Sequence, residues 1–522
     1  MDYNVPKTQE KIRTEFERML EFVMSEEAKE VSADQVERSL FQWLLSLGAQ
    51  LLLLFFQVRS ASCEREGIIV KGQRVRYNSE QKRVYFSIFG KVPFWRPYFH
   101  TSKSGGHTPL DEELSLGLDR YSDFLRETLE YLAVYVPFNK AVDIFQRILK
   151  SSVSTRVEQA IVAEDAEDVL AYYEQKPAPA AKDEAEVLVI QADGKGVPLI
   201  LEKPLTEPVR LGKGQKRGRK KEAIVTTVYT IAANPRTPED VVNSFFQDEK
   251  SKITLSKPQN KHIWATLDGK TTALSRLGQE VASRQCSHIQ HKVALADGCE
   301  ALQKRIKEEF PDFRLILDFV HANEYLWKVA NSLFGEKDEG REKWVKKQTA
   351  LMLSGKIRDV IDDFRARAKM KSRTKNQVQK LEKTANYFER NLTYMDYATY
   401  LANGWPIASG VIEGACRHFV KDRFELSGMR WEQGGAENLL RLRAIAENDD
   451  WDDYHSFRRQ QRHQRLYGAP LLTEQLLETR ALKLNTPAIP QKEKTDKSAM
   501  ALSQPTKEPE NASTYYALPL VG

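Results

Sequence analysis

Three acidic residues stand out because each follows a segment that predicts a strand or a turn. Asp193 follows the apolar run VLVIQ, Asp297 follows VALA, and Glu413 lies within ASGVIEGACRHF. Asp before Gly is common in turns, and Glu in a first helical turn stabilises the helix dipole, so each residue alone has a structural explanation. Two Asp residues at neighbouring strand ends, however, lie only ~5–10 Å apart and repel each other unless a cation lies between them.

Clustered carboxylates are the ligands that Mg²⁺ and Mn²⁺ prefer. We therefore expect Asp193, Asp297 and Glu413 to hold two such ions, which can activate a water or a 3′-hydroxyl for phosphodiester chemistry. Asp318, at the end of LILDF, is an alternative to Asp297 as the second ligand. His321 either orients a carboxylate or contacts the scissile phosphate, or it caps a helix; both interpretations stay open.

The segments around these residues predict a mixed α/β sheet. EVLVIQADGKGVPLILEK predicts two strands joined by a turn at the glycines, and AIVTTVYTIAA predicts a third strand. HKVALADG and FRLILDFV predict two more strands, separated by a helix over CEALQKRIKEEF. An antiparallel start followed by a parallel continuation is typical of ribonuclease-H-like folds, so we expect an α/β core of that class with a helical insertion.

The rest of the chain predicts helical regions around one small β unit. FNKAVDIFQRILKSSVSTRVEQAI, with Ser154 as a helix N-cap, is either a DNA-binding helix-turn-helix or an ordinary helical hairpin. In the small β unit, NSEQ predicts the turn of a hairpin. The expected regions are a helical N-terminal segment (1–64), the small β unit (65–110), a helical region (111–180), the first part of the catalytic core (186–335), a helical insertion (336–403), the second part of the core (404–465) and a largely disordered tail (470–522).

Over about residues 65–450 the chain resembles the Asp-Asp-Glu transposases of bacterial insertion sequences, in the branch akin to Mutator-like elements. The most specific segments are QADGKGVPL, RLGKGQKRGRKKEAIVTTVYT, ALADGCEAL, LILDFVHANEYLW and ASGVIEGACRHFVKDRFELSGMRW. In that branch a D-x-x-H signature, here Asp318 to His321, follows the second Asp, and a helical region precedes the Glu. Relatives often have a Cys-x-x-Cys-like motif before PLDE, whereas this chain has only His100 and His107 there, so no zinc is expected.

The resemblance implies a transposase that cleaves transposon ends and transfers the freed strand into target DNA. It implies Asp193, Asp297 and Glu413 as metal ligands, terminal inverted repeats and target DNA as partners, and a homo-oligomer on DNA. Two rival functions remain: a ribonuclease-H-like nuclease without strand transfer, and an inactive DNA-binding protein derived from a transposase.

Basic residues near the expected site are candidates for phosphate contacts, although charge runs are often only solvated surface. A glycine-containing loop between two strands carries Arg210, Lys213, Lys216, Arg217, Arg219, Lys220 and Lys221. A second group, Lys421, Arg423, Arg430 and Trp431, follows Glu413. The cluster Cys286, His288 and His291 lacks an evident fourth ligand, so we do not expect zinc there.

Composition sets outer limits on the class of protein. The 522 residues are 41% hydrophobic and 29% charged, with a formal net charge of +6, which permits a nucleic-acid partner without requiring one. Four dispersed cysteines and no signal-like N-terminus indicate a reduced, intracellular protein. The resemblance implies a bacterial cytoplasmic location, associated with the nucleoid when bound to DNA. The apolar run from Leu44 to Phe56 is too short to span a membrane and predicts a buried helix.

Overall fold

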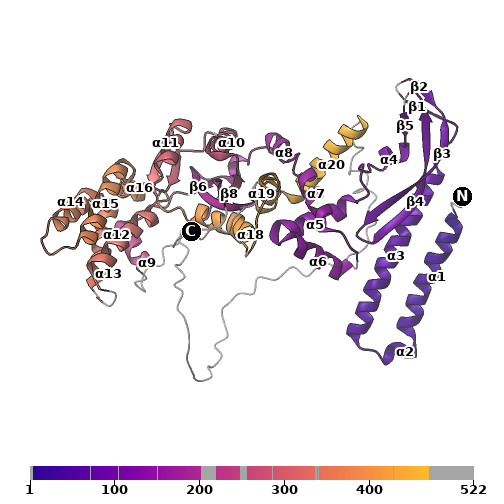
Figure 1. Ribbon diagram of the computed structural model, residues 1–522, viewed down its shortest axis with the longest axis horizontal. Helices are drawn as coiled ribbons and strands as arrows, with labels where there is room; N and C mark the ends of the chain where they lie inside the picture. Colours follow the sequence, from indigo (N-terminus) through magenta and orange to yellow (C-terminus); the bar gives the residue numbers. More distant parts are fainter. Residues whose placement is uncertain are drawn as a thin grey trace, which may run out of the picture.

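The computed structural model describes residues 4–200, 219–246 and 256–468, except 71, 104, 150, 285, 336, 337, 339 and 427. The molecule is elongated (Figure 1). Two long helices and a small antiparallel sheet form one end, a group of helices lies in the middle, and a five-stranded sheet with further helices forms the other end. The expected disordered tail, 470–522, lies outside the described residues.

The five-stranded sheet has the order β10-β9-β6-β7-β8. β6, β7 and β8 pair antiparallel, while β9 and β10 continue parallel to β6. The strands are β6 (Val187–Leu199), β7 (Arg219–Ile231), β8 (Gln259–Thr266), β9 (His291–Ala296) and β10 (Arg314–Leu317). The expected antiparallel start and parallel continuation are therefore present.

The predicted turn at the glycines after Asp193 is wrong. β6 runs as one strand from Val187 to Leu199 and pairs with β7 along its whole length. Gly194 and Gly196 pair with Ile224 and Glu222 of β7. A Cβ at Gly194 would meet the Glu222 side chain and one at Gly196 would meet Lys220, so the glycines leave room for those side chains instead of reversing the chain. β8 and the helix after it, α10 (Gly269–Ser283), were not predicted.

Helices cover both faces of this sheet. One face carries α10 and α11 (Glu300–Glu309), which pack on Leu188, Ile190 and Ala294. The other face carries the core built on Val187, Val189 and Val293. That core includes α9 (Pro238–Phe245), α12 (Phe319–Leu333), α13 (Gly340–Leu353), α14 (Ile357–Ala368), α15 (Lys375–Asn391) and α16 (Tyr397–Ala402). Residues 336–403 are thus largely helical, as predicted.

The middle helices share a hydrophobic core with the sheet. Val134 and Val162 belong to the same buried cluster as Val225 of β7 and Leu440. Residues 176–185 are therefore not a boundary between separate cores. Ser154 is a helix N-cap as predicted, since its side chain accepts a hydrogen bond from the Val157 N–H. The helices are α5 (Asp123–Tyr135), α6 (Phe138–Leu149), α7 (Thr155–Asp165), α8 (Val169–Gln175), α19 (Gln433–Glu447) and α20 (Trp451–Tyr467).

The N-terminal part differs from expectation in two ways. The predicted turn at NSEQ is wrong because β3 continues through it; the hairpin reverses after Ser87, with Gly90 at φ 106°. The predicted burial of the apolar helix is also wrong, because α3 buries only Leu47, Phe56 and Ser60. The elements are α1 (Val5–Met24), α2 (Glu26–Lys29), α3 (Ala33–Ala61), β1 (Ile68–Val70), β2 (Gln73–Val75), β3 (Tyr77–Ser87), β4 (Gly90–Thr101), β5 (Gly105–His107) and α4 (Pro109–Glu113). By length and composition alone, α3 meets the requirement for a membrane-crossing helix.

Candidate active site

Register places three of the predicted acids at the same edge of the sheet. The last β6–β9 pair is Gln191 with Leu295, so Asp193 and Asp297 each lie two residues beyond a paired position. Asp318 follows directly on β10, and its N–H donates to Ala296 O at 2.9 Å. Side chains alternate along a strand, so these three acids face the same side as Val189, Val293 and Ile316. Neighbouring strands are ~4.8 Å apart, which makes this edge strongly acidic.

Glu413 is brought to this edge by hydrogen bonds from its own segment. It lies on α17 (Gly410–Ala415), which begins after Ser409 as the sequence predicts. The Ile412 N–H donates to Gln191 Oε1 on β6 at 2.8 Å, and Gln191 Nε2 in turn donates to the Tyr229 hydroxyl at 3.0 Å. The Ser409 N–H donates to Asp318 Oδ2 at 2.5 Å. The start of α17 is therefore tied to two strands of the sheet at once.

Asp318, His321 and Glu413 form a close cluster. His321 Nδ1 lies 3.2 Å from Asp318 Oδ1 and 3.7 Å from Glu413 Oε1. One candidate ligand atom from each residue lies within 4.8 Å of the others. Asp318 also caps α12 by accepting the His321 N–H at 2.7 Å, so both interpretations of this pair, a cap and a site component, fit the same geometry.

The charges in this cluster are mutually dependent. The hydrogen bond to Asp318 raises the pKa of His321 to about 9, so the ring is an imidazolium at neutral pH. Burial opposes ionisation of Asp318, yet hydrogen bonds from His321 and Ser409 outweigh it and lower the pKa of Asp318. Partial burial and the nearby Asp318 raise the pKa of Glu413. A second positive charge at this point would favour the ionised form of both acids.

Asp193 meets the Glu413 helix through a residue that sequence reasoning missed. Cys416 Sγ lies 3.4 Å from Asp193 Oδ2, while Asp193 Oδ1 accepts the Gly194 N–H at 2.7 Å. Burial and Asp193 raise the pKa of the Cys416 thiol, which stays neutral and acts as the donor. Cys416 follows Glu413 by three residues, so the two lie on the same side of the helix. This spacing is the sequence feature from which the position of Cys416 near the site could have been predicted.

Asp297 opens into a cleft next to the cluster. Its Oδ1 accepts the Cys299 N–H at 2.9 Å, and the residue is partly exposed. The same cleft is lined by His321 and by side chains of α12 and α15. Of the predicted triad, Asp193 contacts Cys416, one helical turn after Glu413, and Asp297 lines the cleft together with His321. Among the described residues, the ligand atoms of Asp318, His321 and Glu413 lie within 4.8 Å of one another, whereas those of the predicted triad do not. The alternative ligand, Asp318, makes the shorter contacts to the Glu413 segment.

The predicted phosphate-binding residues divide into three groups. Arg210, Lys213, Lys216 and Arg217 lie outside the described residues, as does the side chain of Arg219. Lys220 is exposed and forms an ion pair with Glu425, and Lys221 is partly buried. Lys421 and Arg430 are exposed, so their surfaces are open to a partner.

Arg423 and Trp431 are buried, so the prediction that they hold DNA is not retained. The Arg423 Nε donates to Ala133 O at 2.9 Å, and the guanidinium lies 4.9 Å from the centre of the Trp431 ring. Burial lowers the pKa of Arg423 to about 9. The Trp431 N–H donates to Pro198 O at 3.0 Å, which fastens the segment after Glu413 to the end of β6. Their role in this structure is to position that segment.

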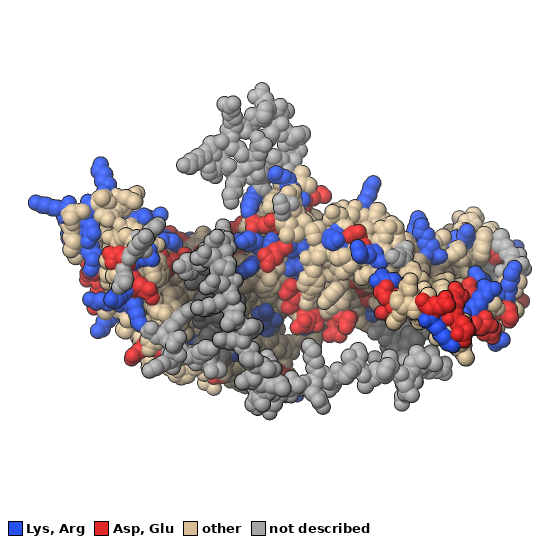
Figure 2. Space-filling model, turned by 90° about the horizontal axis from the view of Figure 1, so that it is seen from below, with Lys and Arg blue, Asp and Glu red and all other residues tan. Residues whose placement is uncertain are grey.

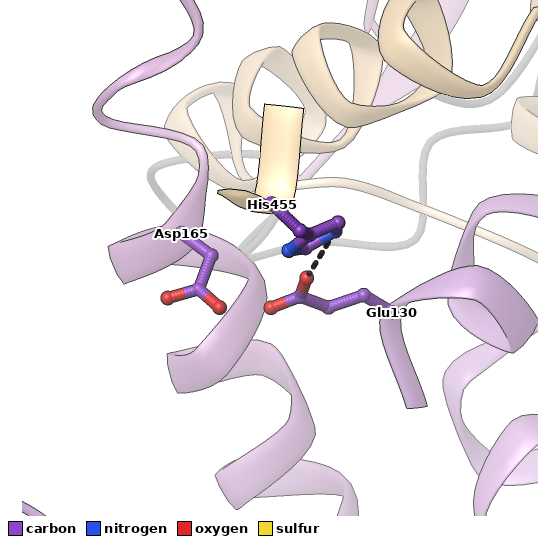
Figure 3. A group of neighbouring side chains, drawn as sticks. All are labelled: Glu130, Asp165 and His455. Atoms are coloured by element: carbon purple, nitrogen blue, oxygen red, sulfur yellow. Dashed lines mark ion pairs between the residues drawn. The ribbon is translucent and has the colours of Figure 1, made fainter. Parts of the chain in front are cut away.

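A second group of ligand-type side chains lies in the middle of the molecule (Figure 3). His455 Nε2 on α20 is 3.5 Å from Glu130 Oε2 on α5, and both are buried. Burial lowers the pKa of His455 to about 3 and raises that of Glu130. Asp165 on α7 already accepts hydrogen bonds from Arg126 and Arg458 on both oxygens. This group is therefore best explained as a network that joins three helices.

No protein-family model matches the chain, and no curated protein matches it in sequence. Among solved structures, the chain is similar to the Drosophila P element transposase in its strand transfer complex, with a TM-score of 0.23 and 10% sequence identity. The match covers 69% of this chain and 86% of that chain. The likeness is weak.

Proposed function

We propose that this chain is a DNA transposase that cleaves transposon ends and joins the freed strand to target DNA. The observation that carries the proposal is that Asp193, within β6, and Asp297 and Asp318, just past the ends of β9 and β10, face one side of the sheet, with Glu413 held nearby through Gln191 and Ser409. The strand order β10-β9-β6-β7-β8, with its antiparallel start, supports assigning the sheet to the ribonuclease-H-like class.

The donor atoms fit hard divalent cations. Carboxylate oxygens from two or three strands and from α17 would hold Mg²⁺ or Mn²⁺, with Asp193, Asp297 and Glu413 as the preferred ligands and Asp318 as the alternative. Two bound ions would supply the charge that activates a water or a 3′-hydroxyl and stabilises the leaving oxygen. The protein's own part is positioning: Gln191 and Ser409 fix Glu413, and Asp318 orients His321 towards Glu413.

The cleft beside Asp297 is suited to the substrate strand. Besides the imidazolium of His321, its lining offers the cationic side chains of Lys328, Lys383 and Arg390, against a single carboxylate, Asp297. Tyr325 and Tyr387 stack there with ring centres 4.0 Å apart, and the ammonium of Lys328 lies 4.4 Å from the Tyr325 ring centre. Cations beside aromatic faces are typical of surfaces that follow a nucleic-acid backbone.

Neutralising two of these cations is expected to flatten the salt dependence of DNA binding. For Lys328→Gln with Lys383→Gln, the slope of log K against log salt should fall by about 1.4–1.8, because each lost phosphate contact removes about 0.7–0.9. Fluorescence anisotropy with labelled oligonucleotides measures this slope. The matched control is Lys343→Gln with Lys347→Gln on the exposed side of α13, which should leave it unchanged. Equal slopes for the wild type, the cleft variant and the control variant would show that the cleft does not bind DNA.

The proposed function is tested with a plasmid that carries the gene and its flanking DNA on both sides. Incubation with the full chain and Mg²⁺ is expected to release ends and to join them to a second, labelled plasmid. Cleavage without joining would favour the nuclease, and sequence-specific binding without Mg²⁺-dependent cleavage would favour an inactive DNA-binding protein. Sequencing of the joined products would also test the expected bacterial insertion-sequence origin, since terminal inverted repeats would mark the ends.

A further inference from the structure

Helix α3 carries an exposed apolar stripe along its length. The residues follow one another at intervals of three, four or seven, the spacing that keeps side chains on one side of a helix that pairs with another helix. Each has between 41% and 57% of its surface exposed: Phe41, Leu44, Leu51, Phe55 and Val58.

The rest of α3 already has partners within the chain. Leu47 and Phe56 are buried, and Phe56 stacks on Phe94 of β4 with ring centres 4.2 Å apart. Trp43 meets Phe22 of α1 edge-on at 5.1 Å. The stripe is therefore a separate side of the helix, which neither β4 nor α1 covers. At its middle, where Gly48 replaces an apolar side chain, the partly exposed Phe89 of the β3–β4 turn lies against the helix.

The exposed apolar surface is of the size that a second copy would bury. The α3 stripe amounts to roughly 400–600 Å², in the upper part of the range for the largest, often functional, apolar patch of a typical monomer. α1 adds four exposed apolar residues, which brings the total to roughly the 800 Å² that each partner of a stable dimer buries. Those four are Phe16, Leu20, Val23 and Met24.

We propose that the α3 stripe is a self-association surface that docks the same stripe of a second copy of this chain. A stripe with coiled-coil spacing is complementary to itself across a two-fold axis. α1–α3 lies at the end of the molecule opposite α13–α15, so pairing there leaves the acidic edge of the sheet open (Figure 1). The proposal does not depend on the chemistry of that edge.

The charges of the α1–α3 segment as a whole argue against a helix that lies on an anionic membrane surface, while residues 39–58, which carry the stripe, are uncharged. Between Asn4 and Ala61 there are seven Lys or Arg residues and nine Asp or Glu residues. Acidic and basic side chains are interspersed over this end of the molecule (Figure 2). A helix that lies on an anionic membrane carries an excess of Lys and Arg on its polar side, which this segment lacks.

Light scattering during size-exclusion chromatography tests the proposal on the full chain. The wild type is expected to elute with twice the 59.9 kDa chain mass at tens of micromolar concentration. Leu44→Glu with Leu51→Glu should halve that mass, because charges would be buried at the centre of the interface. Leu44→Ala with Leu51→Ala keeps a high helix propensity and should raise the dissociation constant by at least tenfold.

The matched control is Leu118→Glu with Ile148→Glu, which places the same charges on exposed apolar residues elsewhere and should leave the mass doubled. Far-ultraviolet circular dichroism of each variant checks that the helices persist. A monomeric wild type, or a doubled mass that survives both stripe variants, would overturn the proposal. So would flotation of the wild type with phosphatidylglycerol vesicles that is abolished by the stripe variants while the mass is unaffected.

Discussion

Asp193→Asn and Glu413→Gln are each expected to reduce Mg²⁺-dependent DNA cleavage by about 10³-fold or more. The physical reason is that each change removes a charged ligand while keeping its size, and cations at such sites contribute several kcal/mol to transition-state stabilisation. Nicking rates of a supercoiled plasmid, measured over a range of Mg²⁺ concentrations, would give the loss. Folding should be retained, because Glu413 is exposed and Asp193 keeps its hydrogen bond with Gly194.

The control for this pair is Asp312→Asn. Asp312 precedes β10, at the other end of the strand from Asp318, and its carboxylate is exposed beside Lys292. Cleavage by this variant should match the wild type. Unchanged cleavage in either Asp193→Asn or Glu413→Gln would sink the assignment of that residue as a metal ligand.

The second prediction with a large effect distinguishes Asp297 from Asp318 as the second metal ligand. Asp297→Asn should lose about 10³-fold in cleavage with no change in stability, because the hydrogen bond that its side chain accepts from the Cys299 N–H can be kept by Asn. Asp318→Asn should lose stability as well, by about 1–3 kcal/mol, because a buried carboxylate that accepts from His321 and Ser409 is replaced. Cleavage rates and chemical denaturation of both variants measure the two quantities.

The stability loss in Asp318→Asn should depend on pH in a defined direction. The pKa of His321 is raised from its ordinary 6.5 to about 9 by Asp318. The stabilisation from this pair is therefore fully present below pH 6.5 and is lost as pH rises through about 9. The difference in unfolding free energy between wild type and Asp318→Asn should be largest near pH 6 and shrink towards pH 9.

In the cleavage test of these two variants, full activity of Asp297→Asn would make Asp318 the second metal ligand instead of Asp297.

Much of the sheet could be predicted because apolar periodicity is a local signal. The runs VALA and LIL end where β9 and β10 end, and an Asp follows at or near each of these strand ends. The predicted turn at the glycines after Asp193 was wrong because glycine is typical both of a turn and of a strand position that leaves room for a neighbouring side chain, here Glu222. Only the pairing with β7, which is a long-range property, decides between them.

The supporting residues of the site could not be predicted for the same reason. Gln191 reads as a polar residue at a strand end, and its partner Ile412 is far away in sequence. Arg423 and Trp431 look like an exposed basic and aromatic pair, yet both fill the core beneath the segment that carries Glu413. The Leu44–Phe56 run predicted burial from composition alone, which does not distinguish a core from a docking surface.

Binding of Mn²⁺ to the purified chain is the most direct test of the proposal that Asp193 and Glu413 are metal ligands. Free Mn²⁺ is followed by electron paramagnetic resonance during titration of the wild type and of the double variant Asp193→Asn, Glu413→Gln. We expect about two ions bound per wild-type chain and none at that site in the double variant, with circular dichroism unchanged. Equal binding by the two proteins, or no binding by the wild type, would contradict it.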